Sequence, residues 1–407
     1  MEKENRENRI MSYKQVKNMS MFDAYVEEEY IYFSNNTFNA LMRIDKKSWK
    51  CKYLKSFGGN DLWSKSLHKK IEKYNNCLFF FPNYAKGISK YNLTTGELSF
   101  YKNQEDFLWI ANIVILDKMA CLVPKSLEQD FWLFDMETCC YINKKKWNQY
   151  IQNTTHSEHI NLRNAVINQN SVWTFDHLTN ILIKITPVID ECKIYYLRDS
   201  DKICSIASDG ENLWIGLYQN QSLVKWNFEE GIVETHSLNW HNRNNKEVFF
   251  LFYLRERLFI LPVEKDEVLV FDFQHNIRSI PIHQRKRVND PIRKKLPLCN
   301  RCIIDNRNVY LLPNASDKMY VYNLDTNIIT GKKIVFNELK IYYNNILQVE
   351  CWGNNERHIK EMEQGLMNVR VDDLLCIVKE ECNNDMAGVG HKIGCGNSIY
   401  NVIKNDC

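Results

Sequence analysis

The stretch that decides the fold reads FILP at residues 259–262, followed by a polar loop and then VLVFDF at residues 268–273. The same phrase returns as YLLP at 310–313 and YVYNL at 320–324. Each copy has an apolar run ending in proline, a short polar loop, and an alternating apolar run that reaches Asp or Asn. Short runs of aromatic and β-branched residues bounded by Asp, Asn, Gly and Pro are typical of β-strands. The phrase therefore predicts two strands joined by a loop.

The spacing inside this phrase hardly changes along the chain. The two ends of the clearest copies are 10 or 11 positions apart, at Pro82/Asn92, Pro124/Asp135, Pro262/Asp272 and Pro313/Asn323. Weaker copies end at Ser34/Asp45, Asp176/Thr186 and Leu217/Asn227. Equivalent positions in the first strand of the phrase are Ile31, Leu78, Ala120, Val172, Leu213, Leu258 and Val309. Successive positions are 47, 42, 52, 41, 45 and 51 residues apart. A period of roughly 40 to 50 residues indicates propeller blades, because helical repeats are shorter.

The chain is accordingly predicted to be all-β, a seven-bladed β-propeller with a short α-helical C-terminal extension. Each unit divides into four antiparallel strands, A to D, and a closed ring of such blades leaves only short sheet edges. Proline at the end of strand B fits this arrangement because proline cannot donate to a strand ladder. A tandem of β-sandwiches is the alternative architecture.

Three regions follow from where the repeat begins and ends. Residues 1–19 form an N-terminal segment that could supply a ring-closing strand, residues 20–337 form the propeller, and residues 338–407 form an extension with short strands and two short helices. Apolar residues at helical spacing around 371–380 and 398–403 predict those helices. A ring-closing strand could come from 10–16 or from 339–349, and the sequence leaves both open.

Composition narrows the function classes. The 53 basic and 50 acidic residues nearly balance, so no global field that would recruit nucleic acid or an anionic membrane is expected. The N-terminus has no apolar core of the kind a signal peptide needs, and no apolar run is long enough to span a bilayer. Fourteen cysteines without a framework pattern are interpreted as reduced thiols. A soluble, cytoplasmic protein without a cofactor is expected.

The fifth unit resembles a known group of propellers. Its sequence SDGENLWIGL at residues 208–217 precedes NQSLVKW at 220–226. This is similar to the repeat of virginiamycin B lyase-like and sensor-type bacterial propellers, in which an Asp-Gly turn precedes a Leu-Trp strand. The resemblance implies the fold over residues 20–337. In lyase-like members a His and a Glu near the central channel act with a divalent metal, but no motif here aligns with those two residues.

In a propeller the D-to-A and B-to-C connections open on one face, where ligands and partners are expected. We call this the loop face. The aromatic and polar candidates for partner binding there are Trp63, Trp109, Trp240, Arg243 and Asp201. Aromatic anchors within polar rims suit recognition of a protein, peptide or glycan, so the first hypothesis is a non-catalytic binding scaffold. A basic run in the link between the last two units could hold an acidic partner, and comprises Arg285, Lys286, Arg287, Arg293, Lys294 and Lys295.

The second hypothesis is a propeller lyase or hydrolase. His156, Glu158, His159 and His241 could supply acid, base or metal-ligating groups near the axis, with a divalent metal only in this case. Residues 156–159 carry no helical signal that would place both imidazoles on one side. The Cys299-x-x-Cys302 pair lacks the second close pair of a structural zinc site and is interpreted as core thiols. Two histidines and a carboxylate converging on one pocket would favour the enzyme.

Overall fold

The computed structural model describes residues 20–60, 64–103, 110–157, 159–197, 201–238, 248–262, 267–272, 276–282, 299–314 and 316–336. The predicted helices of the C-terminal extension, and the segments 10–16 and 339–349, lie outside these residues. The chain divides into two units, and the unit Lys17–Val335 contains all of the strands described below. No helix within the described ranges is long and apolar enough to cross a membrane.

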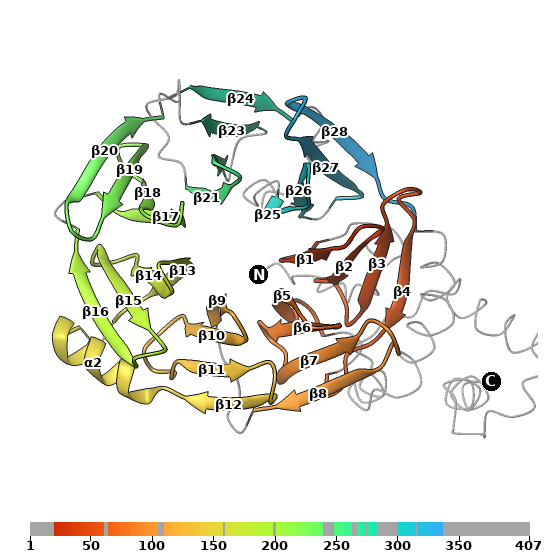
Figure 1. Ribbon diagram of the computed structural model, residues 1–407, viewed down its shortest axis with the longest axis horizontal. Coiled ribbons are helices and arrows are strands. Elements are labelled where there is room, and N and C mark those ends of the chain that lie inside the picture. Colours follow the sequence, from red (N-terminus) through yellow and green to blue (C-terminus); the bar gives the residue numbers. More distant parts are fainter. Residues whose placement is uncertain are drawn as a thin grey trace, which may run out of the picture. The chain divides into compact units, whose positions relative to one another are not determined.

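Seven four-stranded antiparallel sheets form a closed ring, with the first strand of each sheet nearest the axis (Figure 1). Each sheet is built from four consecutive strands, so the predicted seven-bladed propeller is confirmed. Blades 1 to 4 are β1 (Ala24–Val26), β2 (Tyr30–Ser34), β3 (Leu41–Asp45), β4 (Cys51–Lys55); β5 (His68–Tyr74), β6 (Cys77–Pro82), β7 (Gly87–Asn92), β8 (Leu98–Lys102); β9 (Ile110–Leu116), β10 (Met119–Pro124), β11 (Trp132–Asp135), β12 (Cys140–Asn143); β13 (Leu162–Asn168), β14 (Ser171–Asp176), β15 (Ile181–Thr186), β16 (Glu191–Tyr196). Blades 5 to 7 are β17 (Ile203–Ser208), β18 (Leu213–Leu217), β19 (Ser222–Asn227), β20 (Gly231–Ser237); β21 (Phe249–Leu254), β22 (Arg257–Pro262), β23 (Glu267–Asp272), β24 (Ile277–Pro281); β25 (Cys299–Ile304), β26 (Asn308–Pro313), β27 (Lys318–Asn323), β28 (Ile328–Lys333).

The repeat found in the sequence matches these strands residue by residue. In all seven blades, the residue that opens the spaced pair is the last residue of strand B, as Pro82 is in β6 and Ser34 in β2. The residue that closes the pair is the last of strand C, as Asn92 is in β7 and Asp45 in β3. The spacing therefore measures one B-to-C loop plus one strand.

The core lies between neighbouring blades. Phe79 and Phe81 of β6 project toward blade 3, where Phe134 of β11 packs with ring centroids 6.1 and 6.2 Å away. All three rings are fully buried, and burying one such side chain contributes roughly 1.5–3 kcal/mol. Cys302 of β25 is also buried, as expected for a core thiol.

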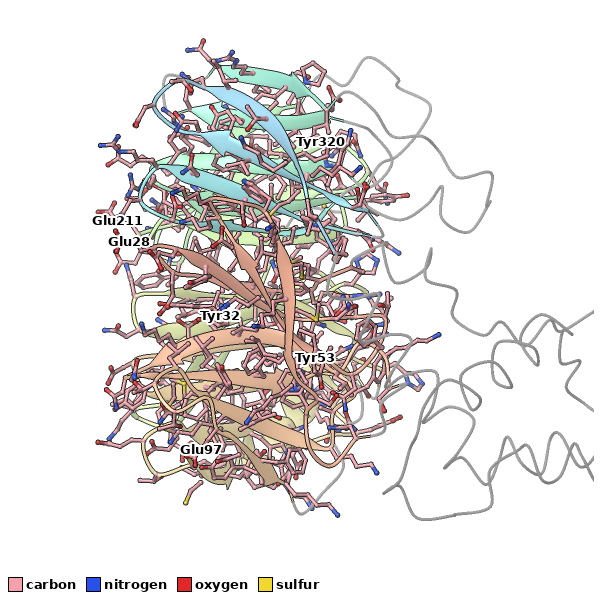
Figure 2. All side chains as sticks on the ribbon, turned by 90° about the vertical axis from the view of Figure 1, so that its right-hand side faces the viewer. Glu28, Tyr32, Tyr53, Glu97, Glu211 and Tyr320 are labelled. Carbon is pink, nitrogen blue, oxygen red and sulfur yellow. The ribbon has the colours of Figure 1, made fainter. Side chains whose placement is uncertain are left out.

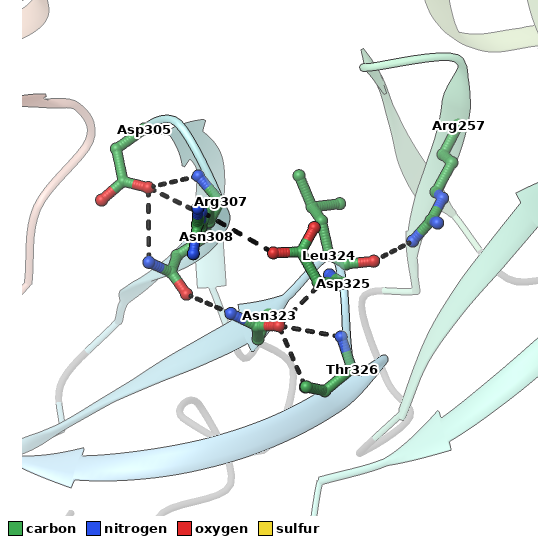
Figure 3. A network of polar contacts seen from close by, with 8 residues as sticks. All are labelled: Arg257, Asp305, Arg307, Asn308, Asn323, Leu324, Asp325 and Thr326. Atoms are coloured by element: carbon green, nitrogen blue, oxygen red, sulfur yellow. Dashed lines mark hydrogen bonds and ion pairs between the residues drawn. The ribbon is translucent and has the colours of Figure 1, made fainter.

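A repeated set of side-chain hydrogen bonds stabilises the turns on the face opposite the loop face. In blade 7 the Asp305 carboxylate accepts the backbone N–H groups of Arg307 and Asn308, and the Asn323 amide donates to the Asn308 side chain at 3.1 Å (Figure 3). Blade 5 repeats this arrangement with Asp209, Asn212 and Asn227 at the same spacing. Figure 2 shows Glu28 and Glu211, from A-to-B turns of blades 1 and 5, on one side of the blades.

A helix that the sequence did not predict lies between blades 3 and 4, and it ends at Thr155, just before the stretch 156–159 in which no helical signal was expected. Helix α2 (Lys145–Thr155) packs against β16, with Trp147 and Ile151, one turn apart, buried on its inner side. His156 ends the helix in a left-handed conformation (φ 51°), and its N–H donates to the carbonyl of Gln152. The helix has no side-chain N-cap, so its sequence start signal is weak.

The ring closes between blade 7 and blade 1. The N–H of Met21 donates to the carbonyl of Pro313, and Cys51 N–H donates to Val335 at 2.8 Å. Lys46 of blade 1 forms a 2.8 Å ion pair with Asp305 of blade 7. Within the described residues, closure therefore uses contacts between two complete blades rather than a strand exchanged from one terminus.

Candidate functional site

The inner strands surround a cavity of about 850 Å³ on the propeller axis, which we call the channel. Six of the seven blades contribute strand A residues to its wall, and blade 1 contributes Phe22, just before β1. Strand A begins at the loop face in every blade because it follows a D-to-A connection. A residue's position within strand A therefore gives its depth in the channel.

Backbone irregularities place basic residues at the loop-face end of the channel. The pairing of β5 with β6 shifts between His68 and Lys70, so Lys69 is an extra residue in the inner strand. The pairing of β13 shifts between Leu162 and Ala165, around Arg163, and that of β25 shifts between Cys299 and Cys302, around Arg301. Such bulges re-aim side chains and are frequent at ligand sites. All three basic residues line the channel.

Contacts between blades bring these residues and one more together. The ammonium group of Lys69 donates to the carbonyl of Ile110 in blade 3 at 2.9 Å. Lys125, which follows the last residue of β10, accepts the N–H of Leu162 on its own carbonyl at 2.9 Å and so lies beside Arg163. We call Lys69, Lys125, Arg163 and Arg301 the cationic mouth of the channel.

The pKa of Lys69 shows how concentrated this positive charge is. Burial, and then repulsion from Lys125, Arg163 and Arg301, together lower its pKa from 10.5 to about 8. An anion near the ammonium group would offset both effects, because an opposite charge favours the charged form. The site is therefore arranged to gain from binding a negative group.

Only part of the positive charge is neutralised inside the channel. The side chain of Asp23 is 1% exposed and lies 3.4 Å from both Lys70 and Arg301. It also accepts the N–H of Ile71 at 2.8 Å, which ties blade 1 to blade 2. Glu72 lies 3.1 Å from Lys70. The ion pairs described in the channel thus involve Lys70 and Arg301 and leave out Lys69 and Arg163.

Polar side chains of the inner strands join successive blades below the mouth. The amide of Asn112 in β9 donates to the carbonyl of Ala165 at 2.9 Å, and the amide of Asn164 in β13 donates to Ile206 at 3.0 Å. Ser205 of β17 accepts the N–H of Leu251 in blade 6 at 3.0 Å. These contacts fix the distances between inner strands, and hence the spacing of the cationic groups.

The far end of the channel has different chemistry. Its lining there comes from the later residues of the inner strands, mainly Ile115, Val166, Ile167, Phe252 and Leu254, with Glu72, Ser208 and Tyr253 beside them. Ile167 is 37% exposed, and the others are partly buried. The channel is therefore polarised, with cations at the loop face and apolar side chains toward the opposite face.

Among the residues predicted from sequence for partner binding, Asp201 is described. It is 2% exposed, and its carboxylate accepts the N–H groups of Lys202, Gln219 and Asn220 at 2.6 to 2.7 Å. These hydrogen bonds join a D-to-A connection to a B-to-C loop, so the buried Asp201 side chain stabilises the backbone of the loop face. The other predicted partner-binding residues lie outside the described residues: Trp63, Trp109, Trp240, Arg243, Arg285, Lys286, Arg287, Arg293, Lys294 and Lys295.

The two described histidines of the enzyme hypothesis are not part of the channel wall. His156 is exposed at the end of α2, and His159 is exposed in the link to blade 4. Glu158 and His241 fall in undescribed segments. Among the described residues, His177 lines the channel, and its ring nitrogen Nδ1 lies 3.0 Å from the carbonyl oxygen of Ile203. Within the described ranges, no three His, Cys, Asp or Glu side chains are grouped to hold a metal ion.

The sequence interpretation missed the cationic mouth. Lys69, Arg163 and Arg301 are basic residues near the starts of three inner strands, and Lys125 follows a strand B. Arg301 lies inside the Cys299-x-x-Cys302 pair, but no local motif joins the four basic residues. The available signal was positional: a basic residue at the same place in several repeats of a ring, where every such place faces the axis.

No protein-family model and no curated protein matches this sequence. Solved structures do match its fold. A streptogramin B lyase is 8% identical with a TM-score of 0.55, and the match covers 78% of this chain and 95% of that chain. A catalytically inactive virginiamycin B lyase from Staphylococcus aureus, solved with quinupristin, is 10% identical with a TM-score of 0.56, covering 74% and 94%.

YCF48 bound to D1 peptide gives a similar match. It is 9% identical with a TM-score of 0.55, and the match covers 75% of this chain and 91% of that chain. Identities this low show a shared fold alone, and that fold hosts both a lyase and a peptide-bound protein. The chain is thus a seven-bladed β-propeller similar in architecture to virginiamycin B lyase and YCF48.

Proposed function

We propose that this protein is a non-catalytic recognition scaffold that binds a partner, a protein, peptide or glycan, through its loop face. The observation that carries the proposal is the cationic mouth, where four basic residues from blades 2, 3, 4 and 7 line one end of the channel. Charge complementarity makes an acidic peptide segment the best-fitting partner.

The electrostatics favour a specific contact over general attraction. The whole chain carries a formal charge of only +3, so the positive charge at the mouth is local. Positive charge concentrated at the mouth of a cleft focuses the field there and raises association rates. Arg163 adds a planar fork that suits a carboxylate.

The comparison with YCF48 supports the proposal at the level of fold. That protein is a propeller of the same architecture and is bound to a peptide. A cytoplasmic location, expected from the sequence, belongs to the same proposal, and cell fractionation tests it.

A fluorescein-labelled Glu-rich peptide tests the proposed function by fluorescence anisotropy. We expect binding that weakens with added salt, and about tenfold weaker binding for Arg163→Gln or Lys69→Gln, because a hydrogen bond to a charged group contributes about 1.5–3 kcal/mol. Lys333→Gln, which removes the same charge from the exposed end of the outer strand β28, is the matched control. Equal affinities for all four proteins would contradict the proposal.

A further inference from the structure

The polarity of the channel follows the depth of each residue. Lys69 and Arg163 occupy the second positions of β5 and β13, next to the loop face. Ile115, Ile167 and Leu254 occupy the sixth positions of β9, β13 and β21. Four residues of strand span about 13 Å. A single molecule reaching both ends would have a negative group and an apolar body of about that length.

The size of the channel suits a small molecule. Ligand cavities in proteins measure roughly 300–1,000 Å³, and the channel measures about 850 Å³. Inner strands of six blades line it, rather than loops alone, so a bound ligand would meet preformed walls.

We propose that the channel binds a small amphipathic anion, with its carboxylate or phosphate head at Lys69 and Arg163 and its hydrocarbon body along the apolar end. This inference rests on the proposed function only in that both use the cationic mouth to bind a negative group. It adds the class of small molecule that enters the channel. The apolar body is matched by Ile115, Val166, Phe252 and Leu254.

The polar groups between the two ends favour a hydrocarbon over an extended peptide in the interior. The lining side chains of Asn112 and Asn164 already donate to the backbone of the next blade. A peptide backbone in this section would leave N–H and C=O groups without partners, which is costly away from water. A hydrocarbon has no such groups to satisfy.

The head-group contact has its own physical support. Lys69 lies close to three other cations, and after burial their repulsion is the second cause that lowers its pKa to about 8. A bound anion removes this repulsion, whereas a neutral head group of the same shape does not. The anionic molecule should therefore bind more tightly than its neutral amide.

Isothermal titration calorimetry with decanoate, decanamide and acetate separates the two halves of the ligand. We expect decanoate to bind at one site per chain, at least tenfold more tightly than decanamide or acetate. Ile167→Asp, which places a carboxylate in the apolar end at a 37% exposed position, should weaken decanoate binding at least tenfold. Ile142→Asp makes the same change at a 43% exposed position on the outer strand β12 and should have no effect.

The Glu-rich peptide distinguishes this inference from the proposed function. Peptide affinity that changes less than twofold in Ile167→Asp, together with lost decanoate binding, supports both. The inference is overturned if decanoate and acetate bind equally, or if Ile167→Asp leaves decanoate binding unchanged. In either case, binding of the Glu-rich peptide would still support the proposed function. Decyl phosphate in place of decanoate tells which head group binds more tightly, and tight binding of either one supports the inference.

Discussion

The amide of Asn164 in blade 4 donates a hydrogen bond to the carbonyl of Ile206 in blade 5, 3.0 Å away, and so crosses between two inner strands. Its oxygen accepts the N–H of Ala165, the next residue in β13. One side chain thus fixes the start of its own strand and the position of the neighbouring blade.

Asn164→Leu should lower the free energy of unfolding by about 1–3 kcal/mol, because the substitution keeps the size but removes donor and acceptor. Urea unfolding measures the change. Asn153→Leu, at an exposed position of α2, is the control and should change stability by less than about 0.5 kcal/mol. Equal stability of the two variants would mean that the contact between the blades contributes nothing.

Peptide affinity should fall as the pH rises through about 8. Lys69 loses its proton near that pH in the free protein, since burial and then repulsion by the neighbouring cations lower its pKa from 10.5. The charged form is present below pH 8, so affinity is greatest there and weakens roughly tenfold by pH 9.5. Anisotropy with the Glu-rich peptide at pH 7 and 9.5 checks this. A Lys69→Gln protein should lose the dependence, and an equally steep decline in that variant would refute the assignment.

Asp201→Ala should destabilise the propeller by roughly 2–4 kcal/mol. The buried carboxylate accepts three backbone N–H groups, which the variant would leave without this acceptor. Thermal unfolding followed by circular dichroism measures the loss. Asp325→Ala, whose side chain is 63% exposed, is the matched control and should melt like the wild type. A melting temperature unchanged in Asp201→Ala would show that the loop face does not depend on this residue.

Helix α2 should be an integral part of the fold. Trp147 is 1% exposed, packs edge-on against Phe131 and donates from its ring nitrogen to Asp190 at 3.0 Å. Trp147→Ala should therefore cost about 3–5 kcal/mol in urea unfolding. Tyr150→Ala removes a 43% exposed ring from the same helix and should cost far less. Similar small effects of both changes would mean that the helix is only loosely attached.

The contact between Lys46 and Asp305 should contribute stability that disappears in acid. Burial raises the pKa of Asp305, but hydrogen bonds from Lys46, Tyr310 and the backbone outweigh it and lower the pKa from 3.8 to about 2. The stabilisation is complete above pH 3.8 and is lost as the pH falls through about 2. Urea midpoints of the wild type and Asp305→Asn should differ at pH 5 and converge toward pH 2. A constant difference would contradict the pairing.

The fold could be predicted because each blade repeats its own local signal. Proline after an apolar run marks the end of strand B in β6, β10, β22 and β26, and the polar residue 10 or 11 positions later marks the end of strand C. Both signals depend only on neighbouring residues. The weaker copies carry no proline, yet Ser34, Asp176 and Leu217 occupy the same place.

Helix α2 could not be predicted with the same ease. Trp147 and Ile151 are its only buried apolar residues, and tertiary contacts of Trp147 with Phe131 and Asp190 contribute to its stability. Short helices depend on such packing more than on propensity.

The cationic mouth was beyond the reach of local patterns for a related reason. Lys69 and Arg163 are 94 residues apart in the chain, and Arg301 lies a further 138 residues on. Only closure of the ring places them at one end of the channel. The bulges that aim them inward arise from pairing between strands, which a single stretch of sequence does not reveal.

The seam between blade 7 and blade 1 joins two complete sheets through Met21, Val335 and the pair of Lys46 and Asp305. No blade depends on a strand borrowed across this seam in the described part of the chain, so the seam resembles the other blade interfaces in kind. The architecture of the ring therefore does not determine which blade comes first in the sequence. A circularly permuted chain that starts at another D-to-A connection should build the same ring.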